Sequence, residues 1–262
     1  MCIRDREYTP LPCPKQNCEI TQYLLPHEVA ARLRTFKKPK SQVKGDITPS
    51  LVTTYADLLA IPLTFIYNQA LSTLDWPLLW KSETVTAIPK NTCPAQLSEL
   101  RNLSCTPLFS KVLESFVLTR LKKNISLSRN QYGGIKGCST EHFLLETWDQ
   151  IIKALEDGDT AANLVSVDFE KAFNRMCHYK CLEAITDLGA DEVAVDWVAS
   201  FLYGRTMSVR VGSSYSTPRP VHGGSPQGSI LGIFLFCATT NVFAEIPQPN
   251  PAMFEDCTIL IY

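Results

Sequence analysis

The chain has 262 residues, enough for one large domain or two small ones, and 45% hydrophobic with 10% aromatic residues is typical of a globular protein. No run reaches the roughly 18 uninterrupted apolar residues that a membrane helix needs, and the polar start MCIRDR is not a secretory signal. The formal net charge is −1, and the ten cysteines include no CxxC pair, so we expect no membrane span, no zinc site, and reduced thiols in a cytosolic or nuclear setting.

The N-terminal part is predicted to be an extended or loosely folded lead-in. One coding possibility for residues 1–6 resembles an adapter used in sequencing libraries, so we expect them to be adapter-derived, a natural start being the alternative. Residues 7–70 form the lead-in, which is rich in proline at first and has a short helix in PHEVAARLRTF. Residues 50–77 predict one helix, or two helices broken at Pro62.

The middle of the chain switches between helical and strand patterns. Residues 80–90 alternate like a strand, and 110–125 predict an amphipathic helix capped by Ser110, with Glu114 near its first turn. Residues 139–158 predict a second helix that begins at Ser139 or Thr140. The small and β-branched run at 161–169 predicts a strand buried on both faces or nearly so.

The C-terminal part continues the alternation. Residues 178–190 and 195–204 predict helices, and 206–221 predict a hairpin that turns at Gly212. An apolar helix follows at 230–246, and a terminal strand at 257–262. Strands and helices in this mixed order predict an α+β or α/β fold.

Charge is segregated along the chain although the total nearly cancels. Residues 101–136 carry seven basic residues against one acidic, whereas 141–201 carry thirteen acidic residues against four basic. A lobe that binds a polyanion beside a lobe that binds metal would show this pattern, and so would two solvated helix faces.

Asp168 is the most informative single residue, because it stands near the end of an otherwise apolar strand. Burying a carboxylate beside Val165 and Val167 costs free energy unless the carboxylate is neutralised, paired or bound to a metal. This position favours a metal ligand, and the alternative is an aspartate that caps the following helix.

The run GGSPQGSILG at 223–232 is the second unusual feature. Its glycines allow a close approach of the backbone, Pro226 stiffens the loop, and Gln227 is held there as a hydrogen-bonding group. Such a loop at the start of a helix can pack against a base pair or a phosphate. A plain connection between hairpin and helix is the alternative.

Together these two features resemble motifs A and B of the reverse transcriptases encoded by non-LTR, LINE-type retrotransposons. The motifs are VSVDFEKAFNRM at 165–176 and GGSPQGSILGIFLF at 223–236. In the same order, AIPK at 87–90 and the run from 100 to 121 resemble the first finger motifs of that family, and 130–145 resemble the next. The resemblance covers roughly residues 37–262.

The resemblance implies an α+β, right-hand polymerase in residues 71–262. Its fingers would span about 71–150 and a partial palm with a mixed or antiparallel sheet about 161–262, with the thumb missing. Such an enzyme copies an RNA template by extending a DNA primer with deoxynucleoside triphosphates, and two Mg²⁺ ions assist the transfer. The parent protein would act in the nucleus or cytoplasm.

The resemblance also assigns roles around the metal and the incoming nucleotide. Asp168 would be the catalytic metal ligand, and the backbone carbonyl of Phe169 would reach one metal. Lys90 and Arg101 would hold the β- and γ-phosphates. Phe173 would lie under the sugar and exclude a 2′-hydroxyl.

Further residues would contact the template and the templating base pair. Gln227, with Pro226 and Gly228, would line that pair, and Lys136 would contact a template phosphate. Tyr262 fits the first position of the family's Tyr-X-Asp-Asp motif, which would lie on a turn beside Asp168.

Because the second metal-binding motif is absent, we expect this fragment not to extend a primer by itself. One alternative is the product of a decayed retroelement that at most binds nucleic acid through basic fingers. Another is an unrelated Mg²⁺-dependent phosphotransfer enzyme built on Asp168 and Glu170.

Overall fold

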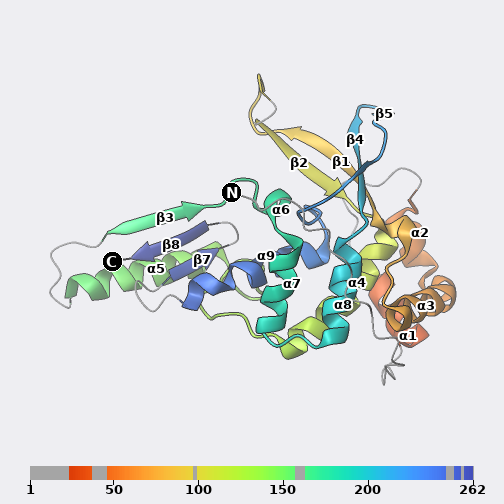
Figure 1. The fold of residues 1–262 in the computed structure, drawn as a ribbon, viewed down its shortest axis with the longest axis horizontal. Helices are drawn as coiled ribbons and strands as arrows, with labels where there is room; N and C mark the ends of the chain where they lie inside the picture. The colour runs from red at the N-terminus through yellow and green to blue at the C-terminus, as the bar shows by residue number, and fades with distance from the viewer. Residues whose placement is uncertain are drawn as a thin grey trace.

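The computed structural model describes residues 24–36, 46–96, 99–156, 163–245, 251–254 and 257–261. The proposed adapter residues 1–6, most of the lead-in before Leu24, and Tyr262 lie outside these ranges. Two β-sheets project from a helical centre, one above it and one to its side (Figure 1). The coarse expectation of mixed α and β content is confirmed.

One end of the molecule consists of helices from the first half of the chain together with one from the second. They are α1 (Pro26–Arg34), α2 (Pro49–Thr54), α3 (Ala56–Thr73), α4 (Leu108–Asn124) and α8 (Glu192–Leu202). The predicted break at Pro62 is wrong, since α3 continues through it and the interruption lies at Tyr55 instead. Pro62 is exposed, so the carbonyl that it leaves without an intrahelical partner can be hydrated.

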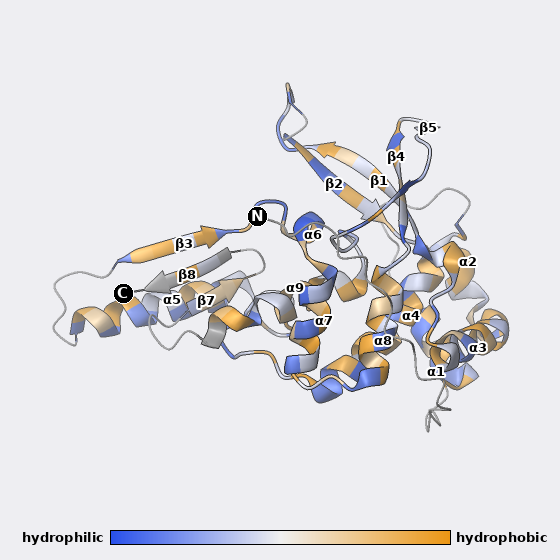
Figure 2. Ribbon diagram, in the orientation of Figure 1, coloured by the Kyte–Doolittle hydropathy of each residue, from blue (hydrophilic) through white to orange (hydrophobic). Residues whose placement is uncertain are grey.

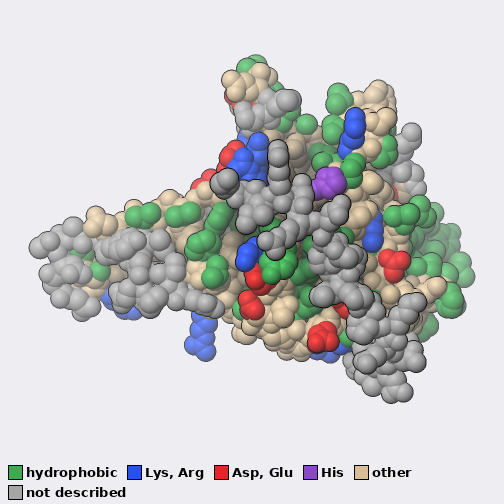
Figure 3. Space-filling view, in the orientation of Figure 1, with side chains coloured by type: hydrophobic (Ala, Val, Ile, Leu, Met, Phe, Trp, Pro, Cys, Tyr) green, Lys and Arg blue, Asp and Glu red, His purple; other side chains and the backbone are tan. Residues whose placement is uncertain are grey.

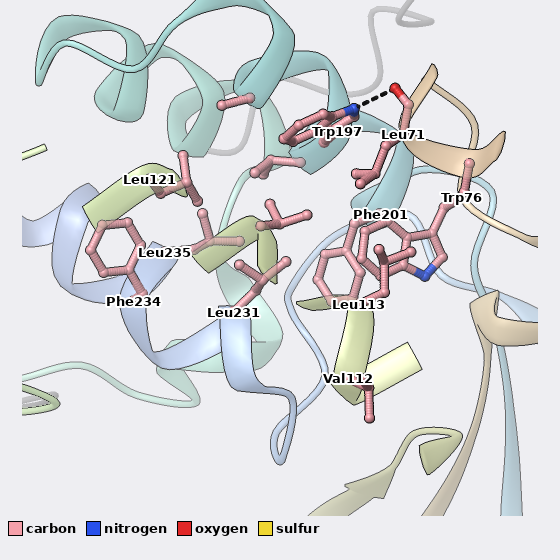
Figure 4. Close-up of a cluster of buried hydrophobic side chains, with 14 of the residues drawn as sticks. Leu71, Trp76, Val112, Leu113, Leu121, Trp197, Phe201, Leu231, Phe234 and Leu235 are labelled. Carbon is pink, nitrogen blue, oxygen red and sulfur yellow. Dashed lines mark hydrogen bonds between the residues drawn. The ribbon is translucent and has the colours of Figure 1, made fainter. Parts of the chain in front are cut away.

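The core lies where α4 and α8 meet α7 (His178–Asp187) and α9 (Ile230–Thr240). Leu113, Leu231 and Leu235 are fully buried there, with Phe201 from α8 among them (Figure 4). The Trp197 indole N–H donates to the carbonyl of Leu71 at 2.9 Å, which fixes α8 against the end of α3. α9 is apolar nearly all round, as expected for a helix enclosed by others.

The first sheet is mixed, as expected from the sequence. Its strands are β1 (Ser82–Pro89), β2 (Leu100–Cys105), β4 (Thr206–Val211), β5 (Ser214–Tyr215) and β6 (Arg219–Pro220). The order is β2-β1-β4-β5, with β6 also on β4; β1 and β4 are parallel and the other pairs antiparallel. Strands from both 71–150 and 161–262 thus share one sheet, and the division at those boundaries stays a prediction.

The second sheet is antiparallel and contains the strand that ends in Asp168. Its order is β3 (Leu164–Asp168), β8 (Cys257–Ile261) and β7 (Pro251–Phe254), and α5 (Thr140–Glu156) contacts β7 and β8. The predicted burial of β3 is wrong, because all five of its residues are exposed. β3 pairs with β8 along one edge and α5 does not cover it, so its hydrophobic residues stand at the surface (Figure 2).

Most of the other predicted elements are confirmed, and a few are corrected. α1, β1, α5, α7, α8, α9, β8 and the hairpin at Gly212 lie where the patterns placed them. β2, β7 and the short helices α6 (Ala172–Arg175) and η1 (Leu78–Lys81) were not predicted. The helix predicted at 230–246 ends at Thr240 and is followed by the 3₁₀ helix η3 (Asn241–Glu245). Ser110 is not the cap of α4, since the helix begins at Leu108 and Ser110 is buried inside it.

Apolar side chains remain at the surface in several places, among them α5, where Leu144, Leu145 and Trp148 are exposed. They also gather over α2 and α3, where Leu58, Ile61 and Phe65 are exposed, and along β3 (Figure 3). Among the described residues, no helix has both the length and the apolar character to cross a bilayer.

Candidate nucleotide and nucleic-acid site

Asp168 is the last residue of β3, and its side chain is exposed. It borders a cavity of about 700 Å³ between α7 and α9, which is also lined by Glu183, Asp187, Phe236 and Phe243. The predicted burial of this carboxylate among apolar residues is therefore wrong. Asp168 does lie at the end of a strand, as predicted, and it borders an open cavity.

Glu170 is paired at the surface with two neighbouring cations. Its Oε2 atom lies 3.0 Å from Nη1 of Arg175, and its Oε1 atom 4.0 Å from Nζ of Lys171. Both partners are exposed. Among the described residues no group of three His, Cys, Asp or Glu side chains could hold a metal ion. Nothing here therefore favours a phosphotransfer site built on Asp168 and Glu170.

The direction of β8 differs from the sequence expectation. β8 is antiparallel to β3, with Cys257 opposite Asp168 and Ile261 opposite Leu164. The end of β8 that was expected beside Asp168 therefore lies at the other end of β3. The reason is that β7 and β8 form a hairpin at the Asp168 end, so that β8 runs back along β3 towards Leu164.

Two aromatic residues after Asp168 anchor this segment to α9. The Phe169 ring lies 5.9 Å from the Phe236 ring and 5.6 Å from the Phe243 ring, and the Phe173 ring lies 5.5 Å from that of Phe236. Lys171 between them has a positive φ of 55°, in the left-handed region. This turn starts α6 and half-buries Phe173 beside α9.

The loop at 223–229 is fixed to this aromatic segment by its backbone. The Ser225 N–H donates to the carbonyl of Phe173 at 2.8 Å, and the Gly224 N–H to that of Met176 at 2.8 Å. Gly224 has a φ of +82°, and a Cβ there would lie 2.7 Å from the Phe173 carbonyl oxygen. Glycine is therefore required at this position, as the sequence suggested for this loop.

The other side of the same loop rests against β2. The Ser104 N–H donates to the carbonyl of Gln227 at 3.0 Å, and a Cβ on Gly228 would lie 2.6 Å from the Ser104 carbonyl oxygen. Pro226 is buried, Gln227 is half-buried and Gly228 is exposed. The loop is thus held between β2 and the segment that follows Asp168, which are about seventy residues apart in the sequence.

Lys90 and Arg101 lie together on the β1–β2 hairpin. Ile88 is paired with Arg101, and the Lys90 N–H donates to the carbonyl of Glu99 at 2.8 Å. Both basic side chains are exposed. Ser104 of β2 contacts the loop at 223–229, and Arg101 lies three positions before Ser104 on the same strand. The two cations therefore lie further along the hairpin, towards its turn.

Lys136 lies in a turn on the other side of α9. The preceding Gly134 packs closely on α9, where an added Cβ would lie 2.6 Å from the Ile233 side chain. The Cys237 thiol donates to the carbonyl of Gly133 at 3.4 Å. Lys136 itself is exposed, and no contact joins it to the loop at 223–229.

Comparison with known proteins identifies the family of the chain. Residues 88–262 match the family model "Reverse transcriptase (RNA-dependent DNA polymerase)". The chain belongs to the reverse transcriptase family. The match includes β2, the segment after Asp168 and the loop at 223–229, which are the elements that meet in the structure.

The relatives of this reverse transcriptase domain come from retrotransposons without long terminal repeats. It is 32% identical over 213 residues, 77% of the chain, to the "Probable RNA-directed DNA polymerase from transposon BS" of Drosophila melanogaster. It is 28% identical over 247 residues, 92% of the chain, to that of transposon X-element of the same organism. The type-1 retrotransposable element R2 polyprotein of Popillia japonica is 28% identical over 180 residues, 68% of the chain. The matches cover 23%, 26% and 25% of these proteins, so the chain spans about a quarter of their length.

Sequence reasoning missed the polar residues that support the loop from inside the reverse transcriptase domain. Glu114 and Arg205 are 0% and 1% exposed, and the His178 Nε2–H donates to the Gly224 carbonyl at 2.7 Å. The signal was present, because Glu114 interrupts an apolar helix face and Arg205 follows Gly204 at the end of α8. A charged residue in an apolar stretch indicates a buried partner.

Proposed function

We propose that this domain, within its longer parent protein, binds an RNA template with a DNA primer and helps to copy the RNA into DNA. The observation that carries the proposal is the loop Gly223–Ser229, which is bonded on one side to the Phe173 carbonyl and on the other to Ser104 of β2. Residues for the nucleotide phosphates, the sugar and the templating base would then face one region, as the family resemblance requires.

The finer architecture is part of this proposal. The β1–β2 hairpin with Lys90 and Arg101 would act as fingers, and β3 with α7 and α9 as palm. An exposed pair of cations on a projecting hairpin suits the negative charge of a triphosphate, which basic side chains neutralise. Phe173 would exclude a 2′-hydroxyl by its volume, and its contact with Phe236 would hold the ring still.

A divalent metal, Mg²⁺ by resemblance, would polarise the phosphate and stabilise the leaving pyrophosphate when bound. The carboxylate of Asp168 and the carbonyl of Phe169 are oxygen ligands of the kind that Mg²⁺ prefers. The described residues do not complete such a site, and we derive no step through the metal. We therefore propose that the 262-residue chain alone does not extend oligo-dT on poly(rA) with Mg²⁺, and primer extension would contradict this.

Binding of a fluorescent RNA–DNA hybrid to the purified chain tests the proposal itself. Anisotropy titrations at several salt concentrations give the dissociation constant and its dependence on salt. With no nucleotide bound, these two exposed cations are free to neutralise phosphates of the hybrid, so we expect Arg101→Ala and Lys90→Ala each to weaken binding and to reduce the salt slope by about one unit.

The matched control is Lys153→Ala, which removes an exposed lysine of α5 that pairs with Asp149. It should leave both the affinity and the salt slope unchanged. Equal behaviour of all three variants would overturn the assignment of the hairpin. Hybrid binding that depends on the hairpin, combined with no extension by the full-length parent protein, would favour a decayed element that retains only nucleic-acid binding.

A further inference from the structure

Three charged side chains are buried beneath the loop Gly223–Ser229, and the function proposed above does not use them. They are Glu83 of β1, Glu114 of α4 and Arg205, which directly precedes β4; we call them the buried triad. Their exposed fractions are 7%, 0% and 1%. Charged groups are almost never buried to this extent without partners, because removing them from water costs several kcal/mol.

Glu114 is bonded to the start of α9. Its Oε2 atom accepts the N–H groups of Ile230 at 2.7 Å and Leu231 at 3.3 Å, and its Oε1 atom accepts the Ser110 hydroxyl at 3.2 Å. The first N–H groups of a helix have no partner within the helix, and a carboxylate there also meets the positive end of the helix dipole. Glu114 therefore fixes the point where the loop becomes α9.

Glu83 acts on the opposite side of the loop. It is hydrogen-bonded to the Ser104 side chain, and the Ser104 N–H in turn donates to the carbonyl of Gln227 at 3.0 Å. The two carboxylates of the buried triad thus support the two ends of the segment from Gln227 to Leu231.

Arg205 links the two carboxylates electrostatically. The charges of Glu83 and Glu114 both act on its guanidinium and oppose the lowering of its pKa by burial. The Nη1 atom donates to the Phe201 carbonyl at 3.3 Å, whereas Nε and Nη2 have no hydrogen-bond partner among the residues that the structure describes. The Arg205 carbonyl also accepts the Val221 N–H at 2.9 Å, just before the loop.

We propose that the buried triad is a positioning group that holds the loop Gly223–Ser229 in register with β2 and thereby sets the place of Gln227. Its role in nucleotide positioning rests on the function proposed above, whereas its hold on the loop can be tested without it. A local role predicts that the loop loosens before the fold does. A role in packing alone predicts that all parts of the domain loosen together.

Amide hydrogen exchange of the purified 262-residue chain separates these two cases. In Glu114→Gln the side chain keeps its size but loses its charge. We expect the amides of Ile230 and Leu231 to exchange at least tenfold faster, while amides in the centre of α8 change less than twofold. A uniform change across the domain would overturn the proposal.

Asp191→Asn is the matched control, because Asp191 is a carboxylate at the start of another helix. It accepts the Ala194 N–H at 3.0 Å at the start of α8 and pairs with Arg120. This variant should speed exchange at Ala194 and leave Ile230 and Leu231 unchanged. If Glu114→Gln does not fold, Ser110→Ala removes one donor to Glu114 and should speed the same two amides about threefold; no change there would also count against the proposal.

Hybrid binding of the same variants tests the functional half. A positioning residue contacts no phosphate, so Glu114→Gln should raise the dissociation constant three- to tenfold and leave the salt slope unchanged. A lower slope would mean that Glu114 acts through phosphate contacts, which contradicts positioning. If the unmodified chain does not bind the hybrid, the proposed function fails, while the exchange result still decides the role of the buried triad.

Discussion

Replacing Gly224 by alanine should destabilise the domain far more than the same change at its neighbour. Gly224 has a φ of +82°, and its added Cβ would lie 2.7 Å from the Phe173 carbonyl oxygen, 2.8 Å from that of Asn174 and 2.9 Å from the Asn174 Cα. These are backbone atoms, so they cannot move aside as the end of a side chain could. Gly223→Ala is the control, since its nearest atom would be the Met176 carbonyl oxygen at 3.7 Å.

The expected size follows from these contacts. A left-handed backbone costs a residue with a Cβ about 1–2 kcal/mol, and forcing extra volume into a packed site adds about 1–3 kcal/mol. A loss of about 3 kcal/mol lowers the melting temperature of a domain of this size by roughly 6–12 °C. Gly223→Ala should change it by less than about 3 °C.

Thermal unfolding followed by circular dichroism measures both variants against the unmodified chain. Exchange of the Ser225 amide, which donates to the Phe173 carbonyl, reports whether the loop has left the aromatic segment. Melting of Gly224→Ala within 2 °C of Gly223→Ala, with the Ser225 amide still protected, would refute the close approach of loop and segment on which the site depends.

Three further predictions follow from buried and capping groups. Arg205→Met should cost about 3–5 kcal/mol at pH 7, because it leaves two buried carboxylates without an opposite charge. Burial raises the pKa of Glu83 and Glu114, so their ionisation opposes folding as the pH rises through their pKa values in the folded state. The stability lost in Arg205→Met, measured by urea unfolding, should therefore shrink from pH 7 to pH 5. A loss of stability that does not change with pH would contradict this. Ser229→Ala removes the cap of α9 and should cost about 1 kcal/mol by the same assay, a neutral effect being the contrary outcome. Burial raises the pKa of the Cys181 thiol to about 12, so brief iodoacetamide treatment of the folded chain should leave it unmodified while the exposed cysteines react, and its rapid labelling would count against this burial.

Local patterns predicted most helices correctly because the apolar spacing that forms a helix is also the spacing that buries it. α5, α7 and α8 begin and end close to the predicted positions. Gly189, which follows the end of α7, has a φ of +96°, as expected for a glycine that stops a helix. Pro62 was misjudged because its cost depends on whether the freed carbonyl faces water, which the sequence does not state.

The strand predictions show a second limit. The apolar run before Asp168 indicated burial on both faces, yet β3 is exposed. An apolar composition shows that a strand can be buried. Whether it is buried depends on other elements of the fold, which must pack over it. β2 was missed because LRNLSC has no simple alternation, and its partner β1 supplies the pairing.

The sequence predicted which residues belong to the candidate site, but it did not predict the hydrogen bonds that bring their segments together. The motif order placed Asp168, Phe173 and Gln227 in one family pattern, but the bonds that join them run through Ser104 and Ser225 backbone groups. Such contacts leave no trace in side-chain chemistry. Arg205 was missed for a similar reason, since its two carboxylate partners lie about 90 and 120 residues away in the sequence.

Photocrosslinking of a bound RNA–DNA hybrid shows directly whether the loop Gly223–Ser229 and β2 lie beside the templating base. An RNA template with 4-thiouracil opposite the next primer position would be bound to the purified chain, irradiated and mapped by mass spectrometry. We expect crosslinks in peptides that contain the loop Gly223–Ser229 or β2. Crosslinks confined to α1–α3 or α5, with none in the loop or β2, would contradict it.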